Sequence, residues 1–355
     1  MKKRLLPFVL LFTVLIISSC HKEPEPEPKD NGYSTGIFIL NEGAFGNSNA
    51  SVTYFDPDSL KVVNHLFEQI NERPLGDVAV SFTRSQNKGY IVVNNSQKIE
   101  VVNLKTFEST GSINGLSYPR QLMLIDDQRG YLTDGNFEGN VLVIDLPGLQ
   151  ITDTIPVGSG PEGMIRFRDR VIVANSGGFG NDSTLSVIDP VTDEVTDTWT
   201  VGYNPVQMVI DADNYLWVLC KGKTIWNSDW TLAVETQSEL VQLDPENGEV
   251  MNRIPVGTIG DFFWPEHLAI TTSGDQLFFI ENGGIYRILL AQPETPHTPF
   301  ISGTFYGFGI EPYQKTIYSL SVPSFTRAGY LVRYKPDGTL IDSLMVGIGP
   351  NQVVF

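Results

Sequence analysis

The chain has 355 residues, and its 24 Lys and Arg against 41 Asp and Glu give a formal net charge of −17 at pH 7. Such an acidic balance speaks against nucleic-acid partners, because these require a basic footprint on the protein. The length is sufficient to bury a large apolar core in a globular fold.

The first twenty residues have the pattern of a secretion signal. Three basic residues follow Met1, an apolar run extends from Leu5 to Ile17, and two serines precede Cys20. The run is too short to span a bilayer. A cysteine at this place resembles the lipobox of bacterial lipoproteins. This resemblance implies that residues 1–19 are a cleaved signal peptide and that the Cys20 thiol is acylated, the alternative being an ordinary signal with a chance cysteine.

Residues 20–35 are predicted to form an acidic, proline-rich tether. The segment from His21 to Asp30 contains no hydrophobic residue, its prolines favour extended geometry and its glutamates repel one another. Such a segment reaches about 30 Å. Acidic residues behind the lipidated cysteine resemble the export signal of Bacteroidetes lipoproteins, which implies an outer-membrane, lipid-anchored protein facing the cell exterior. A periplasmic spacer is the alternative. With Cys20 acylated, Cys220 has no disulfide partner.

From residue 36 to 355 the sequence repeats with a period of about 40 to 45 residues, the range of β-propeller blades. Each unit contains four short apolar runs separated by Gly, Asn, Asp or Pro, which predicts four antiparallel strands. We name these strands A to D. The B strands are expected to begin near Gly36, Lys88, Arg129, Arg170, Tyr215, Gln276 and Thr316. The fold class predicted is therefore an all-β, seven-bladed propeller.

The last segment of the chain is expected to close the ring. Residues 349–355 have the pattern of an A strand with no blade after it, whereas the first blade has no A strand of its own. Completing the first blade with the C-terminal strand removes an open sheet edge. The recurring Val-Gly-x-x-Pro junction between blades resembles that of YncE-like propellers. No long stretch has helical periodicity.

The two faces of the predicted disc differ in sequence. The C–D turns are short and uniform, whereas the B–C loops are long and irregular, which favours function on the B–C face. These loops combine Asn or Glu with Gly and an aromatic residue, and tryptophans lie near them. The candidate ligand contacts are Asn41, Glu42, Phe45, Asn94, Asn95, Asn136, Phe137, Glu138, Asn175, Phe179, Asn282, Trp226, Trp230 and Trp264. Alternatively, the asparagines form left-handed turns and Trp264 packs between blades.

The starts of the A strands are expected to point into the central channel on the same face. The residues at these positions are Asp77, Arg120, Glu162, Gln207, Glu266, His267, Tyr306, Asn351 and Gln352. His267 and Tyr306 are included among the candidate ligand contacts. Some of these polar groups are expected only to satisfy one another.

Catalytic patterns are scarce. No pair of the four histidines has metal-ligand spacing, and no Gly-x-Ser-x-Gly motif occurs. We therefore predict neither catalysis nor a resident metal or prosthetic group. The enzymatic alternative is a calcium-assisted lactonase resembling gluconolactonases, in which Glu42, Asn95, Asn175 and Glu281 supply oxygen ligands.

Four features together resemble the BtuG type of cobalamin-binding surface lipoproteins of Bacteroidetes. These are the anchor, the export signal, the blades and the face on which aromatic residues lie among polar ones. The opening residues Gly36–Asn49 are similar to theirs in kind. The resemblance implies capture of a corrinoid (vitamin B12) without catalysis and its delivery to a TonB-dependent outer-membrane transporter. A glycan-binding propeller and a protein-interaction scaffold are the alternatives, and coordination of cobalt by His267 is left open.

Overall fold

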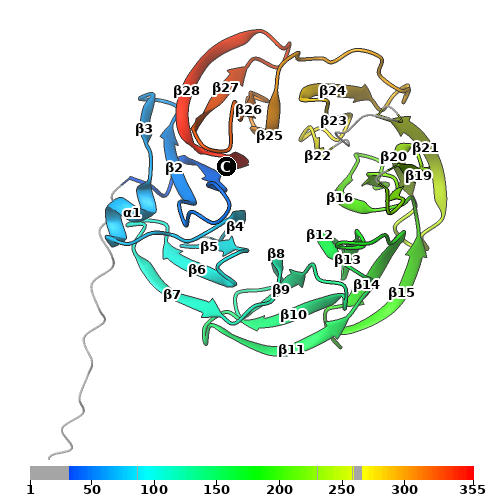
Figure 1. The fold of residues 1–355 in the computed structure, drawn as a ribbon, viewed down its shortest axis with the longest axis horizontal. Coiled ribbons are helices and arrows are strands. Elements are labelled where there is room, and N and C mark those ends of the chain that lie inside the picture. The colour runs from blue at the N-terminus through cyan, green and yellow to red at the C-terminus, as the bar shows by residue number, and fades with distance from the viewer. Residues whose placement is uncertain (1–31, 86, 230, 258, 260–265) are drawn as a thin grey trace, which may run out of the picture.

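The computed structural model describes residues 32–355, except for residues 86, 230, 258 and 260–265. Its strands form seven antiparallel sheets arranged as a ring around a central axis (Figure 1), together with one small hairpin. The predicted all-β, seven-bladed propeller is confirmed.

Four strands build each of the first four blades, and in every blade they follow one another from the axis outward. Blade 1 contains β29 (Pro350–Val354), β1 (Ile37–Asn41), β2 (Ser51–Asp56) and β3 (Lys61–Val63). Blade 2 contains β4 (Ala79–Arg84), β5 (Lys88–Val93), β6 (Lys98–Asn103) and β7 (Ser109–Asn114). Blade 3 contains β8 (Pro119–Leu124), β9 (Arg129–Asp134), β10 (Asn140–Asp145) and β11 (Gln150–Pro156). Blade 4 contains β12 (Pro161–Phe167), β13 (Arg170–Asn175), β14 (Thr184–Asp189) and β15 (Glu194–Thr200).

The remaining blades vary more. Blade 5 contains β16 (Pro205–Ile210), β17 (Leu216–Cys220), β20 (Ser238–Leu243) and β21 (Val250–Val256). The hairpin of β18 (Thr224–Trp226) and β19 (Leu232–Glu235) interrupts it between β17 and β20. Blade 6 contains β22 (Glu266–Ile270), β23 (Gln276–Glu281) and β24 (Gly284–Leu289). Blade 7 contains β25 (Phe305–Ile310), β26 (Ile317–Ser321), β27 (Ala328–Tyr334) and β28 (Leu340–Ile348).

Blade 6 departs from the predicted four strands. Within the described residues its sheet has three strands, and the chain beyond β24 pairs back through an isolated bridge between Ile285 and Ile301. The intervening segment contains Pro293, Pro296 and Pro299. Because proline has no N–H to donate, this segment is unsuited to a regular ladder.

Closure of the ring follows the prediction. β29, the last strand of the chain, pairs antiparallel with β1, with Phe38 opposite Val354 and Leu40 opposite Gln352. The N- and C-terminal strands therefore share blade 1, and the inner edge of β1 is covered by β29.

Each blade buries both of its faces against its neighbours, which explains why the B strands are apolar throughout. In β1, Phe38 and Leu40 pack toward blade 2, while Ile37 and Ile39 pack toward blade 7. Side chains alternate between the faces of a strand, so one apolar run serves two inter-blade cores.

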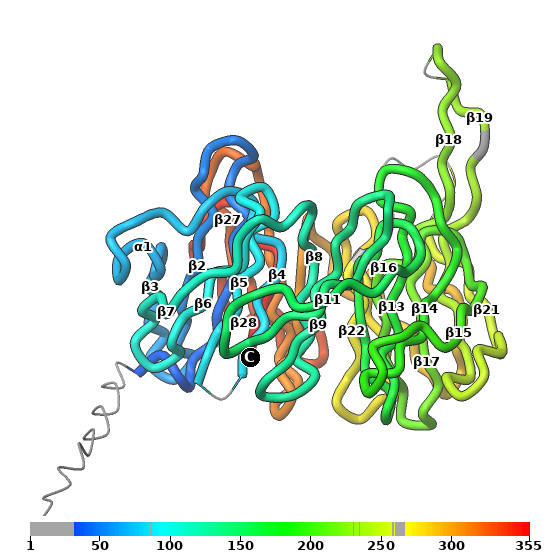
Figure 2. The backbone as a smooth tube through the Cα atoms, turned by 90° about the horizontal axis from the view of Figure 1, so that it is seen from below, coloured from blue at the N-terminus to red at the C-terminus, as the bar shows by residue number. Residues whose placement is uncertain are grey.

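The described chain enters on the face opposite the β18–β19 hairpin. Figure 2 shows this hairpin projecting from one face and the chain start at the other. Arg84, at the end of β4, donates hydrogen bonds to the carbonyls of Ser34 and Gly36 at 2.7 and 3.1 Å. One short helix, α1 (Leu66–Asn71), lies in the connection from β3 to β4. In the described part of the chain no helix is long and apolar enough to cross a membrane.

Candidate ligand-binding site

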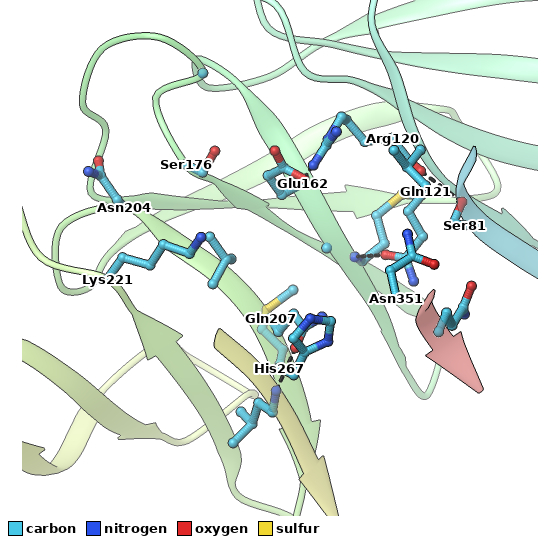
Figure 3. A pocket seen from close by; sticks show the side chains of 18 of the residues that line it. Ser81, Arg120, Gln121, Glu162, Ser176, Asn204, Gln207, Lys221, His267 and Asn351 are labelled. Atoms are coloured by element: carbon cyan, nitrogen blue, oxygen red, sulfur yellow. Dashed lines mark hydrogen bonds and ion pairs between the residues drawn. The ribbon is translucent and has the colours of Figure 1, made fainter. Parts of the chain in front are cut away.

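A cavity of about 750 Å³ opens on the axis of the ring. Its lining comes from the first residues of the inner strands and from the B–C loops, so these two sets share one face as predicted. Figure 3 shows Lys221 and Asn204 on one side of the cavity and Ser81 and Asn351 on the other. This volume is within the range of small-molecule sites.

A β-bulge near the start of every inner strand shapes the cavity. In all seven blades the register against the B strand shifts there, which leaves an extra residue on the inner strand. Bulges re-aim side chains, and here they turn one toward the axis in each blade. In order from blade 1 to blade 7 the bulge residues lining the cavity are Asn351, Val80, Arg120, Glu162, Val206, His267 and Tyr306.

Two valines divide this ring of bulge residues into two polar sides. On the side of blades 3 and 4, Arg120 Nε donates to Glu162 Oε2 at 2.8 Å (Figure 3). Burial lowers the pKa of Arg120, but the neighbouring carboxylate of Glu162 outweighs this effect and the pKa is raised. Arg120 therefore stays charged in the cavity, with its charge compensated by Glu162.

On the side of blades 6, 7 and 1, Glu42 organises the polar groups. Its Oε2 accepts a hydrogen bond from the Tyr306 hydroxyl at 3.2 Å, and its Oε1 accepts one from Asn351 Nδ2 at 3.3 Å. The His267 ring lies next to Tyr306, with 6.4 Å between their centroids. His267 has a φ of 53°, which places a non-glycine residue in the left-handed region. Such strained backbone concentrates at functional sites.

Three glutamines from inner strands join neighbouring blades below these groups. Gln352 accepts the N–H of Phe82 at 2.7 Å, and Gln121 accepts that of Met164 at 2.8 Å. Gln207 accepts the N–H of Leu268 at 2.5 Å. Each bond gives a partner to a backbone N–H of an inner strand, which is the edge strand of its sheet, so these side chains tie neighbouring blades together around the channel.

Exposed aromatic rings surround the mouth. The Phe179 side chain is 72% exposed, and its centroid lies 5.8 Å from that of Phe137 and 5.5 Å from that of Tyr118. Arg120 also lies over the Tyr118 ring, at 5.5 Å. Trp226 on β18 lines the cavity and is 50% exposed. These rings offer a large apolar surface at the entrance of a polar cavity.

The predicted contacts separate into three groups. Five of them line the cavity: Glu42, Phe179, Trp226, His267 and Tyr306. Six others lie on loops of the same face without lining it: Phe45, Asn95, Asn136, Phe137, Glu138 and Asn282. Three are buried and bonded within the blades: Asn41, Asn94 and Asn175. Trp230, Trp264 and Cys20 lie outside the described residues.

The buried asparagines stabilise the blades instead of facing the cavity. Asn41 Nδ2 donates to the carbonyl of Ser51 at 3.2 Å, and Asn175 Nδ2 donates to the Ser186 hydroxyl at 3.0 Å. Asn95, which is exposed, donates to Asp77 at 2.6 Å. Of the four oxygen ligands that a lactonase site would combine, Glu42 is the one that lines the cavity.

Sequence reasoning missed several lining or adjoining residues. The loops and connections of the predicted functional face contain further lining residues that were not singled out, namely Ser176, Asn181, Asn204 and Lys221. Phe325, on the B–C loop of blade 7, packs against Tyr306 with centroids 5.1 Å apart. The signal for Phe325 was its place in that loop, equivalent to Phe45 in blade 1.

A family model described as "Domain of unknown function (DUF5074)" matches residues 35–340. No curated protein matches the chain.

Similar solved structures share the propeller architecture. A quinonprotein alcohol dehydrogenase-like protein from Bacteroides thetaiotaomicron is 14% identical, with 91% of this chain and 78% of that chain covered and a TM-score of 0.67. The periplasmic gluconolactonase of Pseudomonas aeruginosa is 12% identical, with coverage of 90% and 98% and a TM-score of 0.65. A dihydro-heme d1 dehydrogenase in complex with DHE is 12% identical, with coverage of 94% and 77% and a TM-score of 0.57. At these identities the similarity shows the fold alone.

Proposed function

We propose that this chain, which belongs to the DUF5074 family, is a receptor that captures a corrinoid in its central cavity without chemical conversion. The observation that carries the proposal is the cavity itself. Its wall is a ring of bulge residues of mixed polarity, and its mouth bears exposed aromatic side chains.

The chemistry of a corrinoid matches this arrangement. A corrin is a large, flat macrocycle with apolar ring edges and many amide side chains. Arg120, Lys221 and Asn204 offer hydrogen-bond donors, while Glu42 and Glu162 offer acceptors. Aromatic rings such as Phe179 cover apolar edges. Propellers of this fold also include a structure with DHE bound, the dihydro-heme d1 dehydrogenase.

The charges of the cavity suit a ligand without a large net charge. Among the described lining residues, the carboxylates Glu42 and Glu162 balance the cations Arg120 and Lys221. Because long-range steering needs a net field, binding is expected to depend little on salt concentration. This expectation holds although the whole chain is strongly acidic.

The anchor and the transporter belong to the same proposal. A lipid on Cys20 would hold the protein at the outer membrane, facing the cell exterior, and the captured corrinoid would pass to a TonB-dependent transporter. The described chain begins on the face opposite the β18–β19 hairpin, and this hairpin lies beside the cavity (Figure 2). Incorporation of radiolabelled palmitate into the wild type, and its loss in Cys20→Ala, tests the anchor.

Isothermal titration calorimetry with cyanocobalamin tests the capture. A soluble form beginning at Asp30 is titrated at several salt concentrations, with Trp226→Ala as the site variant. Stoichiometric binding that changes little with salt and is weakened by Trp226→Ala supports the proposal. A flat trace at high protein concentration overturns it, and retention on polysaccharide gels then identifies a glycan-binding propeller.

A further inference from the structure

Two aromatic clusters lie on opposite sides of the ring, and each reaches the cavity lining, one through Phe179 and the other through His267 and Tyr306. The first, on blades 3 and 4, consists of Tyr118, Phe137 and Phe179. The second, on blades 6 and 7, consists of His267, Tyr306 and Phe325. Blades 3 and 4 lie on the opposite side of the ring from blades 6 and 7 (Figure 1). A single flat ring system resting on one cluster therefore leaves the other cluster available.

The second cluster is not part of the packing between blades. The core between blades 6 and 7 is built from other side chains, among them Phe305 and Phe308. Phe325 instead stands on the loop between β26 and β27 and is 48% exposed. His267 and Tyr306 are bulge residues that line the cavity. The backbone of His267, the extra residue of the bulge in β22, has a left-handed φ of 53°.

The geometry of this cluster selects an aromatic partner. The rings of Tyr306 and Phe325 are nearly perpendicular, with an interplanar angle of 86° and centroids 5.1 Å apart. His267 and Tyr306 are also tilted, at 65°. Rings set at right angles form a corner, in which a third ring can stack on one face and meet the edge of the other.

The surroundings of the corner are polar. Tyr306 donates to Glu42 at 3.2 Å, and Asn351 donates to the same carboxylate at 3.3 Å. A purely apolar ring bound here would displace water from the Glu42 carboxylate, the Tyr306 hydroxyl and the Asn351 amide without replacing its hydrogen bonds. A ring that contains nitrogen atoms can form hydrogen bonds with these groups.

We infer that the cluster of His267, Tyr306 and Phe325 is a separate subsite for an aromatic nitrogen heterocycle carried by the captured ligand. The inference rests on the proposed function, since the heterocycle enters together with a larger ring system bound nearer blades 3 and 4. In a corrinoid, the base of the nucleotide loop is such a heterocycle. The subsite then distinguishes complete corrinoids from those that lack the base.

Two corrinoids and two variants test this assignment in the full-length protein purified in detergent. Cyanocobalamin carries the base, and dicyanocobinamide lacks it. We expect the wild type to bind cyanocobalamin about 10-fold more tightly, the order of one aromatic contact. Phe325→Ala is expected to remove this preference. Tyr313→Ala, a control on the same blade but at the other end of β25, is 91% exposed and is expected to keep it. Equal loss for both corrinoids in Phe325→Ala, or no preference in the wild type, overturns the inference.

A measurement without any corrinoid separates this inference from the proposed function. Saturation-transfer NMR with 5,6-dimethylbenzimidazole is expected to give a signal with the wild type and with Tyr313→Ala, but not with Phe325→Ala. Methyl β-glucopyranoside serves as the comparison ligand. If cyanocobalamin fails to bind while benzimidazole binds in this manner, the corrinoid proposal fails and the subsite stands. If the signal persists in Phe325→Ala, or if only the glucoside gives one, the subsite assignment is wrong.

Discussion

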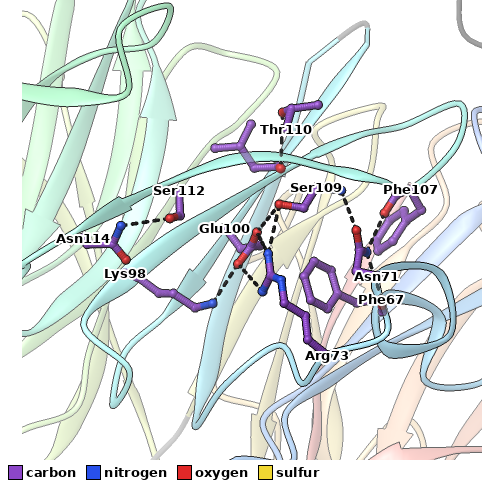
Figure 4. A network of polar contacts seen from close by, with 11 residues as sticks. Phe67, Asn71, Arg73, Lys98, Glu100, Phe107, Ser109, Thr110, Ser112 and Asn114 are labelled. Atoms are coloured by element: carbon purple, nitrogen blue, oxygen red, sulfur yellow. Dashed lines mark hydrogen bonds and ion pairs between the residues drawn. The ribbon is translucent and has the colours of Figure 1, made fainter.

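The buried carboxylate of Glu100 joins blade 2 to the segment that follows α1. Removing its charge is expected to lower the free energy of unfolding, by an amount that the contacts of Glu100 allow us to work out. Figure 4 shows the network around Glu100, whose side chain is 1% exposed. Glu100 accepts hydrogen bonds from Arg73 at 2.7 Å, from Lys98 at 2.7 Å and from Ser109 at 2.6 Å. Burial raises the pKa of Glu100, but these donors outweigh it, so the pKa is lowered.

The substitution Glu100→Gln keeps the shape of the side chain and removes its charge. Breaking a buried ion pair costs about 3–5 kcal/mol, and hydrogen bonds to a charged group are worth about 1.5–3 kcal/mol. The Arg73 and Lys98 side chains are 43% and 16% exposed, so water partly replaces the lost partner. We therefore expect a loss of about 2–3 kcal/mol, which lowers the thermal midpoint of a propeller of this size by about 3–4 °C.

The lowered pKa of Glu100 determines how the stability difference between the wild type and Glu100→Gln changes with pH. Because the pKa of Glu100 is lower in the folded state, its stabilisation is present above the unfolded pKa and is lost as the pH falls through the folded pKa. The gap between the wild type and Glu100→Gln, measured by circular dichroism melts, is thus widest at neutral pH and narrows below about pH 4. Glu194→Gln, at an exposed position on β15, is the control. Equal midpoints at pH 7, or a gap that widens in acid, would refute the reasoning.

Three further outcomes are expected. Val78→Gly should raise the free energy of unfolding by about 1 kcal/mol in denaturant melts, because this β-branched residue has a φ of 59°; an unchanged or lower value contradicts this. Removing residues 350–355 deletes β29 and opens blade 1, so soluble expression and the cooperative melt should be lost, and retention of both argues against closure. Trp226→Ala should weaken cyanocobalamin binding about 10-fold in calorimetry. The melting temperature should not change, since the side chain is half exposed. An unchanged affinity would mean that the β18–β19 hairpin is not part of the site.

The blade count, the closure of the ring and the common face of the B–C loops and the inner-strand starts were accessible from the sequence. Apolar runs and turn residues recur with the period of a blade, and such local signals do not depend on tertiary contacts. The orphan A-strand pattern at residues 349–355 likewise implied the pairing of β29 with β1. Polar residues at the starts of the A strands were expected in the channel, and Arg120, Glu162 and His267 do line it.

The structure alone decided which members of each loop reach the cavity. Asn41 and Asn175 end their strands with the same kind of residue that lines the site elsewhere, yet both are buried and bonded within their blades. Val80 and Val206 line the cavity as bulge residues, although the polar residues near them, Asp77 and Gln207, were the ones expected in the channel. A bulge shifts the register by one residue and so reverses the direction of a side chain. That shift is set by pairing with a neighbouring strand, so the tertiary structure was needed to complete the list of residues that line the cavity.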